Sequence, residues 1–180
     1  MTGESAGADM IGGSAEADMA GESAAADLQA SADIRLLDGA FCVGEALDGF
    51  AVTHPQAGGI ASFTGKVRPG EGLEALELSH YGPLTLPGME ALAADTLARW
   101  TLDGLLIWHR TGLMRPGEPI VLVAAAARHR RDAFLAADFA MDHLKSDAWF
   151  WKREQRADGW HWIEPREQDH ADLARWRTGD

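Results

Sequence analysis

Apolar residues alternate with polar ones, or form short continuous runs, in several segments that predict strands, and they recur at helical spacing in others. The predicted strands are residues 34–37, 41–43, 58–68, 74–81, 105–110, 119–124, 149–152 and 159–163. The predicted helices are residues 44–50, 87–100, 132–145 and 168–176. This order favours an α+β fold in which helices pack on one side of a mostly antiparallel sheet.

A hairpin and a central strand can be placed within this pattern. Residues 58–68 and 74–81 flank a Pro-Gly-Glu-Gly sequence, which predicts that the two strands form a β-hairpin. The run 119–124 is apolar on both faces, as expected for the central strand of a sheet. The helix 87–100 gathers its large apolar residues on one face, which is expected to pack on that sheet.

The start of the chain differs from the rest. Residues 1–33 repeat with a period of nine, are rich in Gly, Ala and Ser, and contain seven acids and no base. Such a segment has too few large apolar residues to offset the entropy of ordering it. We therefore predict a disordered acidic tail over residues 1–33 and one globular domain over residues 34–180.

Composition excludes several classes of partner. The net charge of -12 resides largely in the tail, and the remaining residues hold 21 acids and 16 bases without the basic stripe of a nucleic-acid-binding protein. No apolar run approaches the roughly 18 residues that cross a bilayer, and the N-terminus lacks the order of a signal peptide. We expect a cytoplasmic protein without nucleic-acid or membrane partners. The single cysteine, Cys42, has apolar neighbours and is predicted to be buried.

Lysine is rare in this chain. There are thirteen arginines but three lysines, and two of these, Lys145 and Lys152, lie close together. A lysine amine can lose its proton when desolvated and act as a base or nucleophile, whereas a guanidinium stays charged. The helix 132–145, with Phe134 and Met141 predicted to point inward, places Lys145 at the rim of its buried stripe. The two lysines are a candidate catalytic pair, and two ordinary surface lysines are the alternative.

A basic group precedes the same helix. His129, Arg130 and Arg131 stand between the apolar run and the helix, where free backbone N–H groups and the helix dipole favour an anion. A phosphate-sized anion is the predicted ligand. The alternative is that the two arginines pair with Asp132 and nearby acids.

Other chemistries find no support in the sequence. The seven histidines form no His-Glu-x-x-His motif and have no cysteine partner, so no metal site is predicted. No Gly-x-Ser-x-Gly elbow of a serine hydrolase is predicted, because the match at residues 3–7 lies in the acidic repeat and not between a strand and a helix. The pair Gly65-Lys66 does not complete a phosphate-binding P-loop, because residue 60 is Ile and residue 67 is Val.

Four separated motifs stand in a specific order. They are Phe63-Thr64-Gly65-Lys66-Val67-Arg68, then His129-Arg130 followed by Ala133-Phe134, then Met141-Asp142-His143-Leu144-Lys145, and finally Phe150-Trp151-Lys152-Arg153-Glu154. In order and spacing they resemble the large, catalytic subunit of molybdopterin synthase. The resemblance runs from about residue 34 to residue 176, and residues 82–85 look like an insertion.

The resemblance implies an α/β-hammerhead fold and a catalytic domain of this kind over residues 34–180. It implies a homodimer flanked by two copies of a small ubiquitin-like sulfur-carrier subunit. The C-terminal Gly-Gly thiocarboxylate of that carrier would deliver sulfur to cyclic pyranopterin monophosphate, giving the dithiolene of molybdopterin. No cofactor is implied, since molybdenum is added later by other proteins. A non-catalytic module that binds the carrier or a pterin phosphate is the alternative.

The resemblance also implies roles for individual residues. Lys145 and Lys152 would be the catalytic residues. The substrate-binding residues would be Lys66, Val67, Arg68, His129, Arg130, Arg153 and Glu154. The pocket for the carrier tail would be formed by Phe63, Met141 and Arg166.

Overall fold

The computed structural model describes residues 31–146, 149–164 and 167–176, and it describes no side chain between residues 167 and 170. The strands are β1 (Ser31–Leu37), β2 (Gly59–Lys66), β3 (Ala75–His80), β4 (Gly104–Arg110), β5 (Gly112–Met114), β6 (Pro119–Ala127), β7 (Phe150–Arg156) and β8 (Gly159–Ile163). The helices are α1 (Val43–Thr53), α2 (Gly82–Arg99), α3 (Arg130–Ser146) and α4 (Glu167–Ala174). Most of the predicted tail lies outside the described residues, and β1 begins three residues before the predicted domain boundary.

The first sheet has the strand order β1-β4-β6-β2, and only the β1–β4 pair is parallel. The mostly antiparallel α+β fold expected from the sequence is therefore confirmed. As predicted, β6 is an inner strand, and its side chains from Val121 to Ala127 are buried on both faces. A run of alanines at the end of β6 leaves room for helices to approach both faces of the sheet.

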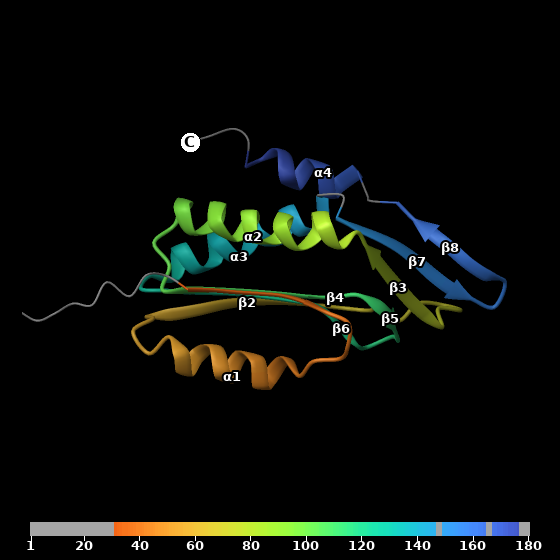
Figure 1. Ribbon diagram of the computed structural model, residues 1–180, viewed down its shortest axis with the longest axis horizontal. Coiled ribbons are helices and arrows are strands. Elements are labelled where there is room, and N and C mark those ends of the chain that lie inside the picture. Colours follow the sequence, from red (N-terminus) through yellow and green to blue (C-terminus); the bar gives the residue numbers. More distant parts are fainter. Residues whose placement is uncertain (1–30, 147–148, 165–166, 177–180) are drawn as a thin grey trace, which may run out of the picture.

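Helices cover both faces of this sheet (Figure 1). Apolar residues of α2 and α3 pack on the face that carries Ile107 and Val123. On the opposite face, Phe50 of α1 packs against Leu106 and Leu122. The expectation that helices gather on one side therefore holds for α2 and α3 and is wrong for α1. The reason is that the inner strands are apolar on both faces, so each face needs a cover.

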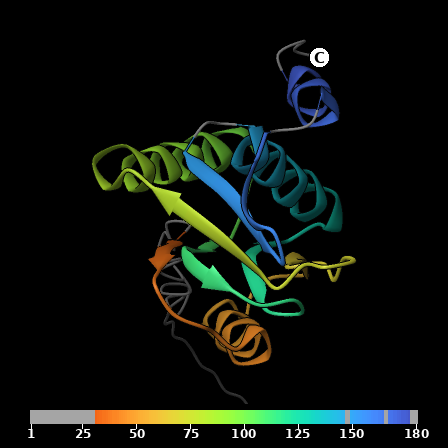
Figure 2. The same ribbon diagram turned by 90° about the vertical axis from the view of Figure 1, so that its right-hand side faces the viewer.

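The predicted hairpin between residues 58–68 and 74–81 does not form. β2 pairs with β6 in the first sheet, whereas β3 pairs with β5 and β7 in a second sheet of order β5-β3-β7-β8. Figure 2 shows this second sheet lying across one end of the molecule. The apolar residues that alternate along β3 are still buried, because Leu76 and Leu78 pack in a separate apolar cluster with Met114.

Three local predictions are also corrected. Residues 41–43 form no strand: Cys42 is the N-cap of α1 and is exposed, because it precedes the helical residues that pack on the sheet. Helix α2 begins at Gly82, so residues 82–85 form its first turn and Pro87 lies inside the helix. Phe134 is 64% exposed, since the face of α3 that meets the sheet is formed largely by alanines, together with Met141 and Leu144.

The C-terminal helix α4 is held on α3 by a buried acid. Asp142 Oδ2 accepts hydrogen bonds from Arg175 Nε at 2.9 Å, from Arg175 Nη2 at 2.6 Å and from Trp176 Nε1 at 2.7 Å. The Trp176 ring packs edge-on against Trp100 and Phe139. Trp176 thereby covers one side of the apolar core formed by α2, α3 and the first sheet. No helix in the described part of the chain is long and apolar enough to cross a membrane.

Candidate functional site

Lys145 lies in the last turn of α3, against the outer strand β2. Its Nζ is 5.8 Å from the centre of the Phe63 ring, which is 42% exposed. Met141, one turn earlier on α3, is buried. The structure therefore brings Phe63 and Lys145 together, and the amine is exposed over an aromatic ring. Arg166, the other residue predicted for this pocket, lies outside the described residues.

A close approach of strands explains the glycine in the Phe63 motif. A Cβ at Gly65 would lie 2.6 Å from Val121 Cγ1 on β6 and 3.5 Å from Cε1 of Phe63. A larger residue here would clash with the Val121 side chain, whereas its distance to the Phe63 ring would be an ordinary van der Waals contact. Gly65 thus allows β2 to lie close to the Val121 side chain next to the Phe63 ring.

Lys152 lies on β7, opposite Leu78 of β3, and its side chain is exposed. Two residues earlier, Phe150 stacks on the buried ring of His109, with a centroid distance of 3.9 Å and an interplanar angle of 14°. The pKa of His109 is lowered to about 4, chiefly because the ring is buried and also because the positive charge of Lys152 lies nearby. His109 is therefore neutral near pH 7 and lies beneath the strand that carries Lys152.

The segment of Lys66, Val67 and Arg68 leaves the end of β2, where Lys66 and Arg68 are exposed. The Val67 side chain is 2% exposed and packs in the cluster with Leu76, Leu78 and Met114. Its backbone N–H donates to the Glu118 carbonyl at 2.9 Å, and its carbonyl accepts from Gly117 at 2.8 Å. The side chain and N–H of Val67 are thus engaged within the protein and anchor the segment that carries its two basic neighbours. A role of Val67 in binding substrate stays a prediction.

An ion pair between the buried Arg110 and the partly exposed Glu118 supports this segment. Arg110 Nη1 donates to Glu118 Oε2 at 3.1 Å, and Arg110 Nη2 donates to the Leu113 carbonyl at 3.2 Å. The backbone N–H of Arg115 also donates to Glu118 and is the main cause that lowers the pKa of this carboxyl. The turn before β6, to which Val67 is bonded, is thereby held in one conformation.

Arg153 and Glu154 point to opposite faces of β7, as successive residues of a strand do. The Arg153 guanidinium pairs with Glu77 and lies 4.4 Å from the centre of the Trp160 ring. Glu154 shares its face with Lys152 and pairs with Arg156 at 2.7 Å. The structure thus brings Glu154, but not the Arg153 guanidinium, to the face of Lys152.

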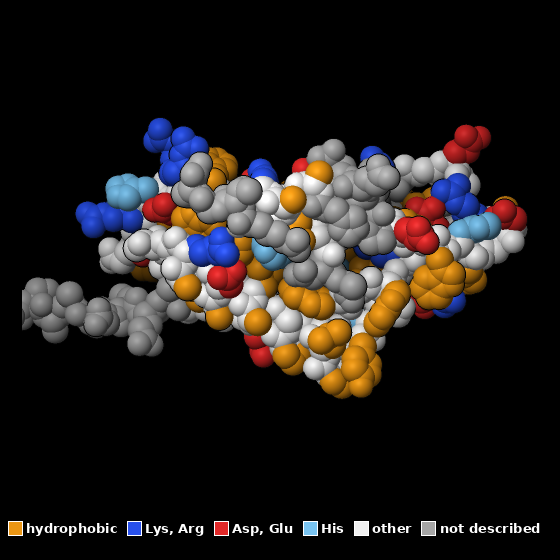
Figure 3. Space-filling model, turned by 90° about the horizontal axis from the view of Figure 1, so that it is seen from above, with side chains coloured by type: hydrophobic (Ala, Val, Ile, Leu, Met, Phe, Trp, Pro, Cys, Tyr) orange, Lys and Arg blue, Asp and Glu red, His pale blue; other side chains and the backbone are white. Residues whose placement is uncertain are grey.

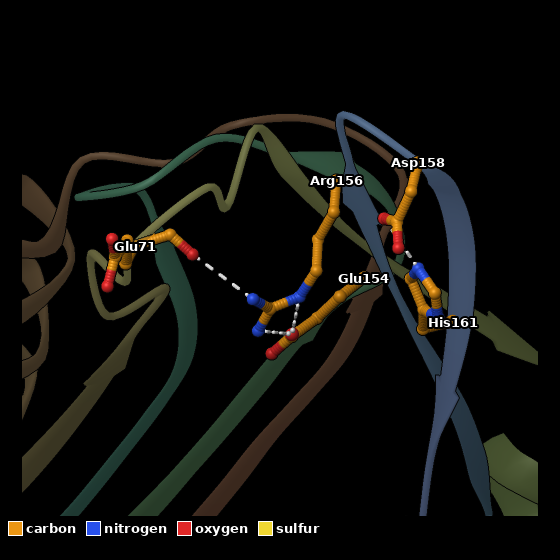
Figure 4. A network of polar contacts seen from close by, with 5 residues as sticks. All are labelled: Glu71, Glu154, Arg156, Asp158 and His161. Carbon is orange, nitrogen blue, oxygen red and sulfur yellow. Dashed lines mark hydrogen bonds and ion pairs between the residues drawn. The ribbon is translucent and has the colours of Figure 1, made fainter.

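Figure 4 shows the polar contacts at the far end of this hairpin. Arg156 bonds both Glu154 and the carbonyl of Glu71, at 3.1 Å for the latter. Asp158 and His161 are joined at 2.8 Å, and this bond is the main cause that lowers the pKa of Asp158. The Arg156–Glu71 bond ties the β7–β8 hairpin to the loop before β3, and the other contacts lie within the hairpin.

The basic group of His129, Arg130 and Arg131 lines an open pocket of about 680 Å³, together with three further residues. Those are Gly58, Arg128 and Phe134. Figure 3 shows blue side chains around a histidine at the end of the molecule where α3 begins. In the part of the chain that the structure describes, no ion pair joins these arginines to an acid, which disfavours the predicted pairing with Asp132. The arrangement suits an anion at a helix N-terminus.

The basic pocket and the lysines lie at opposite ends of α3. With a rise of 1.5 Å per residue, the backbone positions of Arg130 and Lys145 are about 22 Å apart. One chain therefore does not bring His129 and Arg130 to the two lysines, contrary to the simplest interpretation of the sequence. Sequence patterns also carry no signal for His109, whose importance depends on a contact with Phe150 across two sheets.

The fold and these residues define a mixed α+β protein with an exposed lysine at one end of α3 and a basic pocket at the other. The model of the MoaE protein family matches residues 38–147, and the chain belongs to that family.

Several catalogued relatives carry the name molybdopterin synthase catalytic subunit. The one from Ralstonia nicotianae is 42% identical over 146 residues, covering 79% of this chain and 83% of the relative. The one from Cereibacter sphaeroides is 48% identical over 128 residues, covering 71% and 88%.

Solved structures agree with this assignment. The molybdopterin biosynthesis MoaE protein from Burkholderia ambifaria matches with a TM-score of 0.70 and 38% identity, covering 82% of this chain and 99% of that one. The molybdopterin synthase structure from Staphylococcus aureus matches with a TM-score of 0.65 and 26% identity, covering 72% and 95%. A complex of subunits 1 and 2 of the molybdopterin-converting factor from Helicobacter pylori has a TM-score of 0.65 at 19% identity, covers 74% and 91%, and shows the fold alone.

Proposed function

We propose that this chain is the catalytic subunit of a molybdopterin synthase and acts as a sulfurtransferase. It would take sulfur from the thiocarboxylated C-terminus of a small carrier subunit and transfer it to cyclic pyranopterin monophosphate, forming the dithiolene of molybdopterin. The observation that carries this proposal is the contact of the Lys145 amine with Phe63, because separated motifs of the family meet there. The names of the relatives support the same activity.

The carrier tail would enter beside Phe63. A Gly-Gly terminus has no side chains, so it can approach an exposed aromatic ring and an edge strand closely. The amine of Lys145 would then lie next to the acyl sulfur. The match to the molybdopterin synthase from Staphylococcus aureus supports the same enzyme assignment.

The two amines would have different tasks. Lys145, at the end of a helix and over a ring, would assist sulfur transfer by moving a proton or by stabilising the charge that develops. Lys152, on the strand held by Phe150, would hold the anionic groups of the substrate. Glu154, on the same face of β7, would border the pterin.

The basic pocket requires a second copy of the chain if it is to serve the same reaction. Because Arg130 and Lys145 are at opposite ends of α3, two copies with antiparallel α3 helices would place the pocket of each beside the lysines of the other. The exposed Phe134 and Ile60, on α3 and β2, would be covered in such a homodimer. His129 and Arg130 would then bind the substrate phosphate.

The test is reconstitution from purified parts. The full-length chain, thiocarboxylated carrier and cyclic pyranopterin monophosphate are mixed, and dithiolene formation is measured. Turnover that depends on the thiocarboxylate supports the enzyme. If the carrier and the pterin bind but no dithiolene forms, the alternative of a non-catalytic binding module is the correct one.

Arg130→Ala and Arg68→Ala are each expected to weaken binding of the pterin substrate. Each replacement removes charge-assisted hydrogen bonds to phosphate, which contribute about 1.5 to 3 kcal/mol. Binding of the carrier should change much less. Titration of the pterin and of the carrier against each variant measures both effects, and equal losses for the two ligands would place these arginines at the protein interface.

A mixing experiment serves as the control for Arg130. Proteins with Lys145→Ala and with Arg130→Ala are mixed under conditions that exchange subunits. A composite site predicts activity that neither variant has alone, because a mixed dimer holds one site with both residues intact. Activity no higher than the average of the two variants would show that Arg130 acts within its own chain.

A further inference from the structure

His109 is a polar ring in a position that an apolar residue would fill. It is 6% exposed and follows Leu105 and Ile107 on the face of β4 that α2 and α3 cover. Its Nδ1–H donates to the Arg110 carbonyl at 3.1 Å, so the neutral ring carries its free lone pair on Nε2. A desolvated imidazole at this position costs stability, which calls for a reason beyond packing.

The face of the His109 ring packs against the first residue of β7. Phe150 is the first residue of β7 and lies nearly parallel to His109 at 3.9 Å. Lys152 has its side chain on the same face of β7 as Phe150, since the two are two residues apart. The positive charge of Lys152 adds to burial in lowering the pKa of His109.

Helix α2 fixes the residue before β7. Thr85 Oγ1, which is fully buried, donates to the Trp149 carbonyl at 3.0 Å. The Trp149 indole lies on Gly88, where an added Cβ would be 2.7 Å from the ring. At the start of β7, Trp149 is therefore held by α2 and Phe150 by the ring of His109.

We propose that His109 is a positioning residue for Lys152, which fixes the strand carrying the amine through the Phe150 stack and keeps an uncharged ring beside it. The inference rests on the proposed role of Lys152 in the reaction. A charged residue in place of His109 would put a second positive or negative charge beside the amine, and an aliphatic residue would remove the flat surface that Phe150 needs. A neutral aromatic ring satisfies both requirements.

The scarcity of lysine makes the proposal directly measurable. The chain has only Lys66, Lys145 and Lys152, so limited acetylation followed by mass spectrometry reports the reactivity of each amine separately. The variants are His109→Leu, which keeps volume but loses the ring, and His109→Phe, which keeps the ring. Ile107→Val is the matched control, because it alters the same buried column one position further from Phe150.

In His109→Leu, the reactivity of Lys152 is expected to change by about 3-fold or more, equivalent to about half a pKa unit, while Lys145 and Lys66 stay constant. His109→Phe should restore the native value, and Ile107→Val should leave all three unchanged. The KM for the pterin should rise in His109→Leu, with the KM for the carrier unaltered. An unchanged Lys152 amine, or equal changes at all three lysines, would overturn the proposal.

These readouts separate the inference from the proposed function. If Lys152→Ala retains activity, the role of Lys152 in catalysis is wrong, yet acetylation still reports whether His109 positions its amine. If Lys152 is catalytic and its reactivity does not depend on residue 109, the positioning proposal alone fails.

Discussion

Lys145→Ala is expected to lower the rate of dithiolene formation by about 10²-fold or more, the usual size of a lost general acid–base or charge-stabilising group. The amine lies over Phe63 and is exposed, so its loss leaves no buried group unsatisfied and the fold should persist. Binding of the carrier should also survive. Single-turnover assays with thiocarboxylated carrier measure the rate, and circular dichroism checks the fold.

Lys145→Arg distinguishes the two ways in which the amine can act. A guanidinium keeps the charge but does not lose its proton, and it is larger and planar. We expect Arg to fail nearly as badly as Ala, because a compact amine over the Phe63 ring is what the structure presents. Retention of most activity by Arg would mean that charge alone is needed.

Lys152→Ala completes the series, and its main effect should be on substrate binding. Arg35→Ala serves as a control for the loss of one exposed positive charge, since Arg35 pairs with Asp33 on the far side of the first sheet. Near-normal rates in both lysine-to-alanine variants would show that Lys145 and Lys152 are ordinary surface lysines without a role in the reaction.

The free energy of unfolding is expected to fall as pH drops from about 6.5 towards 4, in part through one buried histidine. The pKa of His109 in the folded protein is about 4, below its ordinary value of 6.5, chiefly because burial disfavours the charged ring. The unfolded chain therefore takes up this proton first, and acid favours unfolding. By pH 4.5 the expected loss from this group is about 2 to 3 kcal/mol.

Urea unfolding at pH 7.5 and pH 4.5 measures this effect in the native protein and in His109→Phe. The phenylalanine variant should lose less stability between the two pH values, by about 2 to 3 kcal/mol, since its ring does not titrate. Carboxylates that titrate in the same range contribute equally to both proteins and cancel in the difference. An equal change in the free energy of unfolding between the two pH values in both proteins would show that His109 is readily protonated in the folded state.

The elements with strong periodicity could be predicted from the sequence. The apolar run of β6 and the helical spacing in α3 specify which residues must leave water, and these elements form where predicted. The lysine count and the order of the motifs are sufficient by themselves to single out Lys145 and Lys152. Phe63 and Lys145 then prove to be neighbours in the fold.

Strand pairing could not be predicted, because alternation says which face of a strand is buried but not against what. The sequence from β2 to β3 has the form of a hairpin, yet the two strands enter different sheets, since Val67 and Leu78 bury in a cluster of their own. Exposure of Phe134 has a similar cause: alanines on α3 fill the narrow space above the alanines of β6.

The sequence by itself determined which groups can take part in chemistry. These are two amines on adjacent elements and a basic segment before a helix, together with the order of the family motifs. The tertiary structure decided their distances. It placed Lys145 on Phe63, put His109 beneath the strand of Lys152, and set Arg130 at the opposite end of α3. The physical reason is that local patterns fix which side chains are buried, whereas distances between elements follow from how whole faces pack together.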